Sequence, residues 1–288
     1  MNHYSDIFIN AFKGYANYFI GQVMNPAWDN YFYWLIAISL FFWSLELLFP
    51  WRIKQGAFRK DFWLDSFYMF FNFFLFSLVG FAAVSSVVST AFNDLIFNLF
   101  GWRNLVAIQV GQLPAAVQML ILFVVKDFIQ WNVHRLLHYV NWMWEFHKVH
   151  HSVEEMGFAA HLRFHWMENV IYRTIEYIPL SMIGFGIQDF LVVHLFTLAW
   201  GHFNHANINV PLGWLKYIFN SPQMHLWHHA EHIPNRYGVN FGITLSLWDY
   251  LFKTDYMPKE GRDEPLGFEN LKQFPKTFLT QILYPFKK

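Results

Sequence analysis

The chain contains no cysteine, and charged residues occupy only 14% of its 288 positions. Without cysteine it cannot form a disulfide, a thiolate metal site, an iron–sulfur cluster or a cysteine nucleophile. A soluble domain carries roughly 25% charged residues, so the low charge of a chain that is 55% hydrophobic indicates a surface that largely faces lipid. The formal net charge is zero, which gives no reason to expect nucleic acid as a partner.

Three segments are long and apolar enough to cross a bilayer, which takes about 20 residues. They are Tyr31–Pro50, a segment within the uncharged stretch Ser66–Asn93, and Pro114–Trp131. Proline is common in the first turn of a helix, so Pro114 fits the start of the third span. The stretch Met167–Gly201 has charge-free runs that are too short for a full crossing, and it predicts a hairpin that enters the membrane and returns.

The charges of the loops predict an orientation. The loop between the first two spans carries four basic residues, Arg52, Lys54, Arg59 and Lys60. The next loop has only Asp94 and Arg103. The positive-inside rule therefore places the first loop in the cytoplasm. Because the predicted hairpin returns the chain to the same side, every histidine-rich segment is expected on the cytoplasmic face.

All but one of the 15 histidines lie between His134 and His232. Most recur every three or four residues, which places their rings on one face of a helix. The groups with this spacing are His134 and His138; His147, His150 and His151; His161 and His165; His202 and His205; His225, His228 and His229. A lone histidine on an apolar helix is usually packed or solvated, which is our interpretation of His3 and His194. Burying many imidazoles without partners costs free energy for each one, so the clusters predict a metal site.

The number and type of ligands narrow the choice of metal and the number of metal ions. One zinc ion takes three or four protein ligands, so eight or more clustered histidines predict two metals with roughly four imidazoles each. Neutral nitrogen ligands suit iron, zinc and copper alike. The chain has no H-E-x-x-H, no P-loop and no convincing dinucleotide fingerprint, which argues against a zinc protease, a P-loop nucleotide-binding protein and a dinucleotide-dependent enzyme. A redox-capable metal pair at a membrane surface fits best, in particular an iron pair that activates O₂.

From about Lys126 to Tyr256 the sequence resembles the sterol desaturase and fatty acid hydroxylase superfamily of membrane di-iron oxygenases. The motifs that carry the resemblance are H-R-x-x-H at His134–His138, HKVHHS at His147–Ser152, LRFHWME around His165, HANI at His205–Ile208, HLWHH at His225–His229 and WDYLFKT at Trp248–Thr254. The usual N-Y-G reads Asn240–Gly242 with a central phenylalanine, and Lys253 replaces the glycine of L-F-G-T. Tyr139 stands where the alkylglycerol-cleaving branch has glutamate, which argues against an ether-lipid substrate.

The resemblance implies a set of iron ligands. Eight match the histidine motifs directly: His134, His138, His147, His150, His151, His225, His228 and His229. His205 matches a further ligand position, and His202, on the same helix face, is a candidate tenth ligand. His161 and His165 are interpreted as residues that orient the ligands.

Three carboxylates are candidates for supporting the ligands from outside. Asp127 shares one helical stripe with His134 and His138, so it is expected to accept the free N–H of a ligating imidazole. The alternative is a solvated carboxylate that pairs with a neighbouring lysine or arginine. Asp249 and Glu231 are further candidates of the same kind.

These observations predict an all-α, multi-pass integral membrane protein with a cytoplasmic, histidine-rich di-iron site. Residues 1–113 are expected to anchor it, residues 114–256 to form the catalytic region and residues 257–288 to form a soluble tail. The resemblance implies two iron ions, O₂ as co-substrate and hydroxylation of a membrane lipid such as a fatty acyl chain or sterol, with desaturation as the alternative. Because the chain has no haem module or iron–sulfur cysteines, we expect a separate ferredoxin- or cytochrome-type electron donor with its reductase.

Two other classes of protein fit the sequence less well. A metal transporter holds its ligands near the bilayer midplane, whereas these clusters follow the spans. A bis-histidine haem protein needs single histidines on facing helices rather than adjacent pairs. The final residues YPFKK place both lysines at the very terminus, unlike the eukaryotic dilysine retrieval pattern, which favours the bacterial inner membrane over the endoplasmic reticulum.

Overall fold

The computed structural model describes residues 3–28, 30–72, 82–102, 110–182 and 190–287. Within these ranges the regular secondary structure is helical, and the β-type pairings described are isolated bridges between loops. The prediction of an all-α protein is therefore confirmed for the part of the chain that the structure describes.

The α-helices are α1 (His3–Met24), α2 (Tyr31–Leu48), α3 (Phe62–Phe70), α4 (Ala82–Phe100), α5 (Ala115–Tyr139), α6 (Asn141–His151), α7 (Trp166–Met182), α8 (Phe190–His205), α9 (Pro222–His228), α10 (Leu247–Phe252) and α11 (Phe278–Leu283). Short 3-10 turns lie between or after them: η2 (Val110–Gln112), η3 (Phe158–Leu162), η4 (Gly213–Tyr217), η5 (Leu271–Gln273) and η6 (Tyr284–Phe286).

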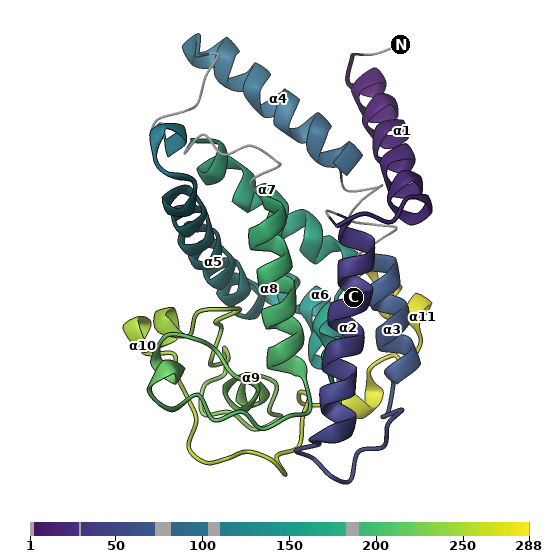
Figure 1. The fold of residues 1–288 in the computed structure, drawn as a ribbon, viewed down its shortest axis with the longest axis vertical. Helices are drawn as coiled ribbons and strands as arrows, with labels where there is room; N and C mark the ends of the chain where they lie inside the picture. The colour runs from purple at the N-terminus through teal and green to yellow at the C-terminus, as the bar shows by residue number, and fades with distance from the viewer. Residues whose placement is uncertain (1–2, 29, 73–81, 103–109, 183–189, 288) are drawn as a thin grey trace.

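The long helices form a bundle whose C-terminal ends meet. Figure 1 shows α8 running between α5 and α2, and α8 contacts both. All three run toward the end of the molecule where α9 and α10 lie. Helices α1 and α4 pack against each other at the opposite end. The bundle therefore brings three distant parts of the chain to one end.

Two of the expected spans are present as helices. By length and composition, α2 and α5 could cross a membrane. Helix α5 begins after Pro114, as expected, but it continues past Trp131 to Tyr139. The first histidine pair therefore lies on the same continuous helix as the apolar segment. The expected second span includes residues 73–81, which lie outside the described residues. Residues 183–189, where the turn of the expected hairpin would lie, are also outside them, and α7 and α8 flank this segment in the chain.

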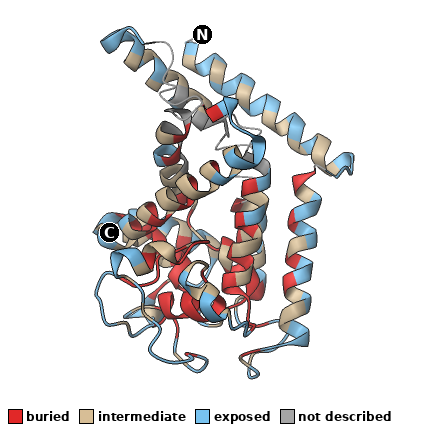
Figure 2. Cartoon of the chain, turned by 60° about the vertical axis from the view of Figure 1, so that its left-hand side comes forward, coloured by how far each residue is buried: buried red, intermediate tan, exposed pale blue. Residues whose placement is uncertain are grey.

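Burial is concentrated at the end of the bundle where α6 and α9 lie (Figure 2). Helix α1 has no buried residue, and α9 is buried along its whole length. On α2, large apolar side chains such as Leu40 and Phe41 are more than half exposed, at 52% and 58%. Exposed apolar surface of this kind indicates contact with a membrane or a partner. The tightly packed core thus surrounds the histidine-rich elements.

The loop after α2 is tied to the rest of the fold by two of its arginines. The buried Arg59 guanidinium lies 2.5 Å from Asp65 Oδ2, and Asp65 Oδ1 accepts a hydrogen bond from Arg163 at 3.0 Å. Arg52 donates to the carbonyl oxygens of Arg262 and Glu264 at 2.6 and 2.5 Å. The basic residues used to infer orientation therefore also hold the loop against η3 and the C-terminal residues.

Candidate metal centre

Nine histidines converge in two groups at the buried end of the bundle. The first group contains His134, His138, His147, His151 and His228. The second contains His150, His205, His225 and His229. Within each group, ligand nitrogens of all members lie within 4.8 Å of one another. The rings come from α5, α6, α8, α9 and the residue that follows α9.

Each H-x-x-H-H motif supplies both groups. On α6, His147 and His151 enter the first group, while His150 enters the second. The motif at α9 divides the other way: His228 joins the first group, and the flanking pair joins the second. Successive residues of a helix are rotated by about 100°, so positions i and i+4 share a direction that i+3 does not. The two adjacent histidines of each motif therefore point to different groups.

Local sequence explains why α9 forms at this place. The Ser221 hydroxyl accepts a hydrogen bond from Met224 N at 3.2 Å, which caps the helix. Pro222 follows at the first helical position, where its missing N–H costs nothing. The cap thus fixes where the H-x-x-H-H motif enters the core.

Backbone carbonyls orient four of the rings. In each of them Nδ1 lies 2.7–3.1 Å from a carbonyl oxygen. The pairs are His134 with Phe241, His150 with Arg163, His205 with Gly201, and His228 with Val239. A carbonyl only accepts, so Nδ1 of the neutral ring carries the proton and Nε2 keeps a lone pair. Four Nε2 lone pairs are thereby free to bind a metal.

These lone pairs lie close enough to repel one another. His150 Nε2 is 3.3 Å from His205 Nε2, although both rings have used their single N–H on a carbonyl. Further buried nitrogens, His138 Nε2, His225 Nδ1 and His229 Nδ1, have no hydrogen-bond partner among the described residues. Buried polar atoms without partners are costly. A metal cation removes both costs, so the residues present fit one metal ion in each group.

The surroundings keep the imidazoles neutral, which is the form that binds a metal. Burial lowers the pKa of His150 to about 3, because the charged ring would lose its hydration. Burial, together with the neighbouring rings, also holds the pKa values of His147, His151 and His229 well below their ordinary value. At neutral pH these rings therefore present lone pairs rather than positive charge.

One carboxylate contacts a ring of the first group directly. Glu168 Oε2 lies 2.8 Å from His147 Nδ1, and its Oε1 accepts the N–H of His165 at 3.1 Å. The side chain is buried. A carboxylate behind a ligating imidazole fixes the orientation of the ring and strengthens it as a ligand. Glu168 lies in the sequence motif LRFHWME, but no helical spacing in the sequence connects it to a ligand.

Asp249 supports the first group through the backbone. Its Oδ1 accepts hydrogen bonds from Phe241 N at 2.9 Å and from the Trp131 indole at 3.0 Å, and its Oδ2 accepts from Gly242 N at 2.8 Å. The Phe241 carbonyl in turn accepts from His134. Asp249 therefore holds the loop that orients a ligand, one step further from the rings than expected.

The expectation that Asp127 accepts the N–H of a ligating imidazole is wrong. Its carboxylate accepts hydrogen bonds from Thr244 N and the Trp248 indole at 3.1 and 3.0 Å, and it also contacts Leu245 N. None of these partners is an imidazole. Asp127 and His134 are seven positions apart on the helix, a rise of roughly 10 Å. The shared stripe therefore places the carboxylate too far up α5 to reach the ring.

His202, His161 and His165 lie outside both groups. His202 Nδ1 is 2.9 Å from His161 Nδ1, and its Nε2 is 3.1 Å from Ser39 Oγ. His165 Nε2 donates to the Ile282 carbonyl at 2.9 Å, which holds the C-terminal segment near α7. Of these three, His161 lies nearest a group, with its ring centroid 5.3 Å from that of His205.

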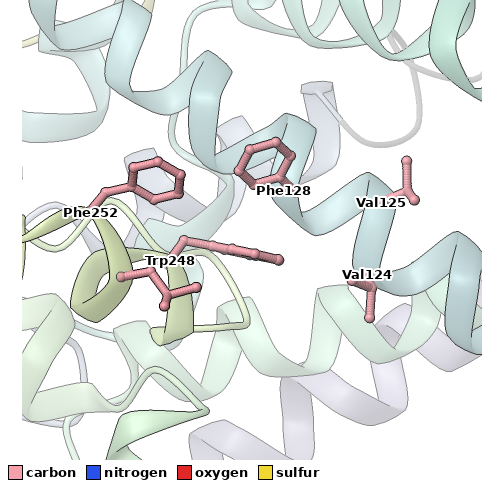
Figure 3. Close-up of a pocket in the computed structure, with 6 residues that line it drawn as sticks. Val124, Val125, Phe128, Trp248 and Phe252 are labelled. Carbon is pink, nitrogen blue, oxygen red and sulfur yellow. The ribbon is translucent and has the colours of Figure 1, made fainter.

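An apolar pocket of about 430 Å³ lies between α5 and α10. Its lining consists of Val124, Val125, Phe128, Trp248, Leu251 and Phe252. Figure 3 shows Phe252 and Trp248 of α10 approaching Phe128 of α5. Apolar linings of this size suit a hydrocarbon segment. The Trp248 indole also donates to Asp127, so the wall of the pocket is joined to the polar network behind it.

Residues 119–254 match the fatty acid hydroxylase family. The matched segment is similar to that family and makes up a little under half of the chain. All nine converging histidines lie within the family segment, which confirms the resemblance inferred from the motifs. No solved structure matches the chain.

Curated relatives of the family carry lipid-modifying names. Ornithine lipid hydroxylase OlsE of Rhizobium tropici is 30% identical over 177 residues, covering 62% of this chain and 53% of the relative. Alkylglycerol monooxygenase of Homo sapiens is 35% identical over 166 residues, covering 54% and 36%. Methylsterol monooxygenase 1-2 of Arabidopsis thaliana is 27% identical over 143 residues, covering 48% and 46%. The chain thus spans about half the length of these relatives or less.

Proposed function

We propose that this protein is an O₂-dependent lipid hydroxylase that holds one iron ion in each of the two imidazole groups. The observation that carries the proposal is the convergence of nine neutral imidazoles inside the fatty acid hydroxylase segment. The names of the relatives, lipid hydroxylase and monooxygenase, support hydroxylation over desaturation. Desaturation of an acyl lipid or sterol remains the competing reaction for the same site.

The residues of the chain have separate tasks in this proposal. When bound, the iron pair supplies the reduction of O₂ that lets one oxygen atom enter a C–H bond. The carbonyls of Phe241, Val239, Gly201 and Arg163 hold the Nε2 atoms inward. Glu168 does the same for His147. Because the rings are buried in a packed core, bulk water is kept from the reacting groups.

We propose that the substrate is a lipid that reaches the site from the bilayer. Helix α5 carries both an apolar segment long enough to cross a membrane and two imidazoles of the first group. The apolar pocket beside Phe128 lies on the same helix and is suited to hold part of a hydrocarbon chain. Residues 1–113 then anchor the protein, residues 114–256 bear the site, and residues 257–288 form a polar tail outside the membrane.

Lipid mass spectrometry tests the reaction. Cells that express the protein and are grown with isotope-labelled O₂ are expected to contain a lipid that is heavier by one labelled oxygen atom. Cells that express a His228→Ala variant should lack it, because this ring belongs to the first group. A lipid that has lost two hydrogens and carries no label would indicate desaturation. Identical lipids in the two strains would contradict an oxygenase.

We further propose a multi-pass protein of the bacterial inner membrane with the histidines on the cytoplasmic side. A reporter inserted at Gly56, or fused after the last residue, is then expected to report the cytoplasm. A reporter inserted at Trp102 should report the opposite side. A Cβ atom added at Gly56 would have no atom within 4 Å, and Trp102 is exposed. Neither insertion therefore disturbs the core. Opposite locations for Gly56 and the C-terminal fusion would contradict the hairpin made by α7 and α8.

A further inference from the structure

We propose that an exposed pair of tyrosines, Tyr139 and Tyr237, flanked by Arg135 and Arg236, is the docking surface for an acidic one-electron carrier protein. We call these four residues the tyrosine surface. The inference rests on the proposed function, because a hydroxylase without its own haem or iron–sulfur cluster takes electrons from another protein.

The tyrosine surface is a built feature rather than a chance exposure. The rings of Tyr139 and Tyr237 are stacked, with centroids 4.5 Å apart and planes 14° from parallel. They remain 38% and 37% exposed. The guanidinium carbons of Arg135 and Arg236 each lie 5.5 Å from the centroid of one tyrosine ring. Two aromatic rings and two cations therefore meet at one place, where α5 ends.

The charge of the tyrosine surface selects the partner. Among the described residues, no carboxylate lies within ion-pair distance of Arg135 or Arg236. Complementary charge raises the rate of encounter and selects the correct partner. Electron-transfer complexes are also small, with less than about 1,200 Å² buried, so a compact surface is sufficient. A carrier with an acidic face meets both conditions.

Aromatic contacts lead from the tyrosine surface to the first group. The ring of Tyr139 lies 6.4 Å from that of the fully buried Phe241. Phe241 in turn lies 5.3 Å from His138, 5.8 Å from His134 and 5.9 Å from His228. Because electron tunnelling weakens exponentially with distance, a carrier docked here has a short path to three rings of the first group.

The loop that carries Tyr237 is held close to the rings. Gly238 has a φ of +100°, which favours glycine. A Cβ atom there would lie 3.0 Å from both His138 Nδ1 and Phe241 Cε1. The absence of a side chain at this position therefore lets the tyrosine surface sit directly over the first group.

The electron count requires two dockings per turnover. Hydroxylation consumes O₂, two electrons and two protons. One oxygen atom forms the new C–O–H group, and the other leaves as water. Each reduced carrier is oxidised by one electron, so two carriers bind and leave in succession. A weak, charge-steered surface suits such exchange better than a large apolar interface.

Binding of a defined carrier tests the proposal. The probe is a plant-type [2Fe–2S] ferredoxin of net negative charge, titrated against the full-length iron-loaded protein in lipid nanodiscs at low salt. Replacement of Arg236 by glutamate is expected to raise the dissociation constant about tenfold, because it places like charges across the interface. Arg236→Ala should raise it less. The matched control is Arg262→Glu, a change of the same charge in another exposed loop, which should leave it unchanged.

Salt and ring variants sharpen the result. In about 0.5 M salt the difference between Arg236→Glu and wild type should shrink, because exposed charges are then screened. The second readout is the rate at which ferredoxin reduces the protein in the absence of oxygen. Tyr237→Phe keeps the stacked ring and should retain this rate, whereas Tyr237→Ala should lower it. Equal affinities of the wild type and Arg236→Glu, or equal weakening by Arg262→Glu, would overturn the proposal. Weaker binding of Arg236→Glu to anionic vesicles, with unchanged ferredoxin affinity, would assign the surface to lipid headgroups instead.

A separate experiment tests the proposed function on which this inference rests. Wild-type protein reduced with dithionite and supplied with lipid and O₂ should form the hydroxylated lipid without any carrier. If it does not, the hydroxylase assignment is wrong, while the ferredoxin dissociation constants still judge the tyrosine surface by themselves.

Discussion

Replacing His228 with alanine is expected to remove metal from the first group and to abolish lipid hydroxylation. The ring is fully buried, its Nδ1 donates to the Val239 carbonyl at 2.7 Å, and its Nε2 lies 3.1 Å from His151 Nε2. It is the one member of the first group that comes from α9. No other described histidine is placed to replace it, so the loss of affinity should exceed the roughly 100-fold cost of losing a residue that only supports a ligand.

The matched control for this experiment is His232→Ala. His232 is exposed, follows His228 by one helical repeat in the sequence, and belongs to neither group. Elemental analysis of the purified protein should show at least one metal ion fewer per chain in the His228 variant and no change in the control. Wild-type protein that contains one zinc ion and no iron, although produced with iron supplied, would contradict the di-iron proposal.

The spacing of the histidines was sufficient to predict that they share a site. Positions i, i+3 and i+4 project from one side of a helix, and the structure brings nine such rings together. The same spacing did not predict that adjacent rings, such as His150 and His151, serve different groups. The helical step of about 100° turns adjacent rings apart. Which group each ring reaches depends on the rotation of α6 and α9 about their own axes, and that rotation is set by the packing of the whole core.

The supporting residues were harder to predict for a related reason. Asp127 shares a stripe with two ligands, which predicts a contact, but the rise along α5 separates it from both. Glu168 reaches His147 from a different helix, 21 positions later in the chain, so no periodicity connects them. The stripe of one helix shows which residues share a direction. Which residues meet across helices depends on tertiary packing.

The sequence predicted two of the apolar helices but not the bounds of the second expected span. The apolar runs at α2 and α5 are continuous, so composition located both helices. Within the uncharged stretch Ser66–Asn93, α3 ends at Phe70, residues 73–81 lie outside the described residues, and α4 extends past Asn93 to Phe100. Hydropathy reports the cost of placing a segment in lipid, but it does not report where a helix begins or ends. For that reason the second span stays a proposal.

Replacing Glu168 with alanine is expected to weaken metal binding in the first group by about 10- to 100-fold, the usual cost of losing a carboxylate that supports a ligating histidine. In the wild type, Glu168 Oε2 lies 2.8 Å from His147 Nδ1. Without it the ring can rotate, and its buried N–H has lost its acceptor. Glu168→Gln keeps an acceptor oxygen at the same place, so it should bind metal within several-fold of wild type.

Competition with a chelator of known affinity measures this difference, because the two groups should then lose metal at separate chelator concentrations. The second group contains no ring that contacts Glu168, so its affinity should stay unchanged and serve as an internal reference. Glu176→Ala is the matched control, since this buried carboxylate on α7 accepts a hydrogen bond from Gln130 at 2.6 Å and belongs to neither group. Equal metal loss in the Glu168 and Glu176 variants would show that α7 acts only as packing. Loss confined to Glu168→Ala, with recovery in Glu168→Gln, would establish that the carboxylate orients His147 for the metal.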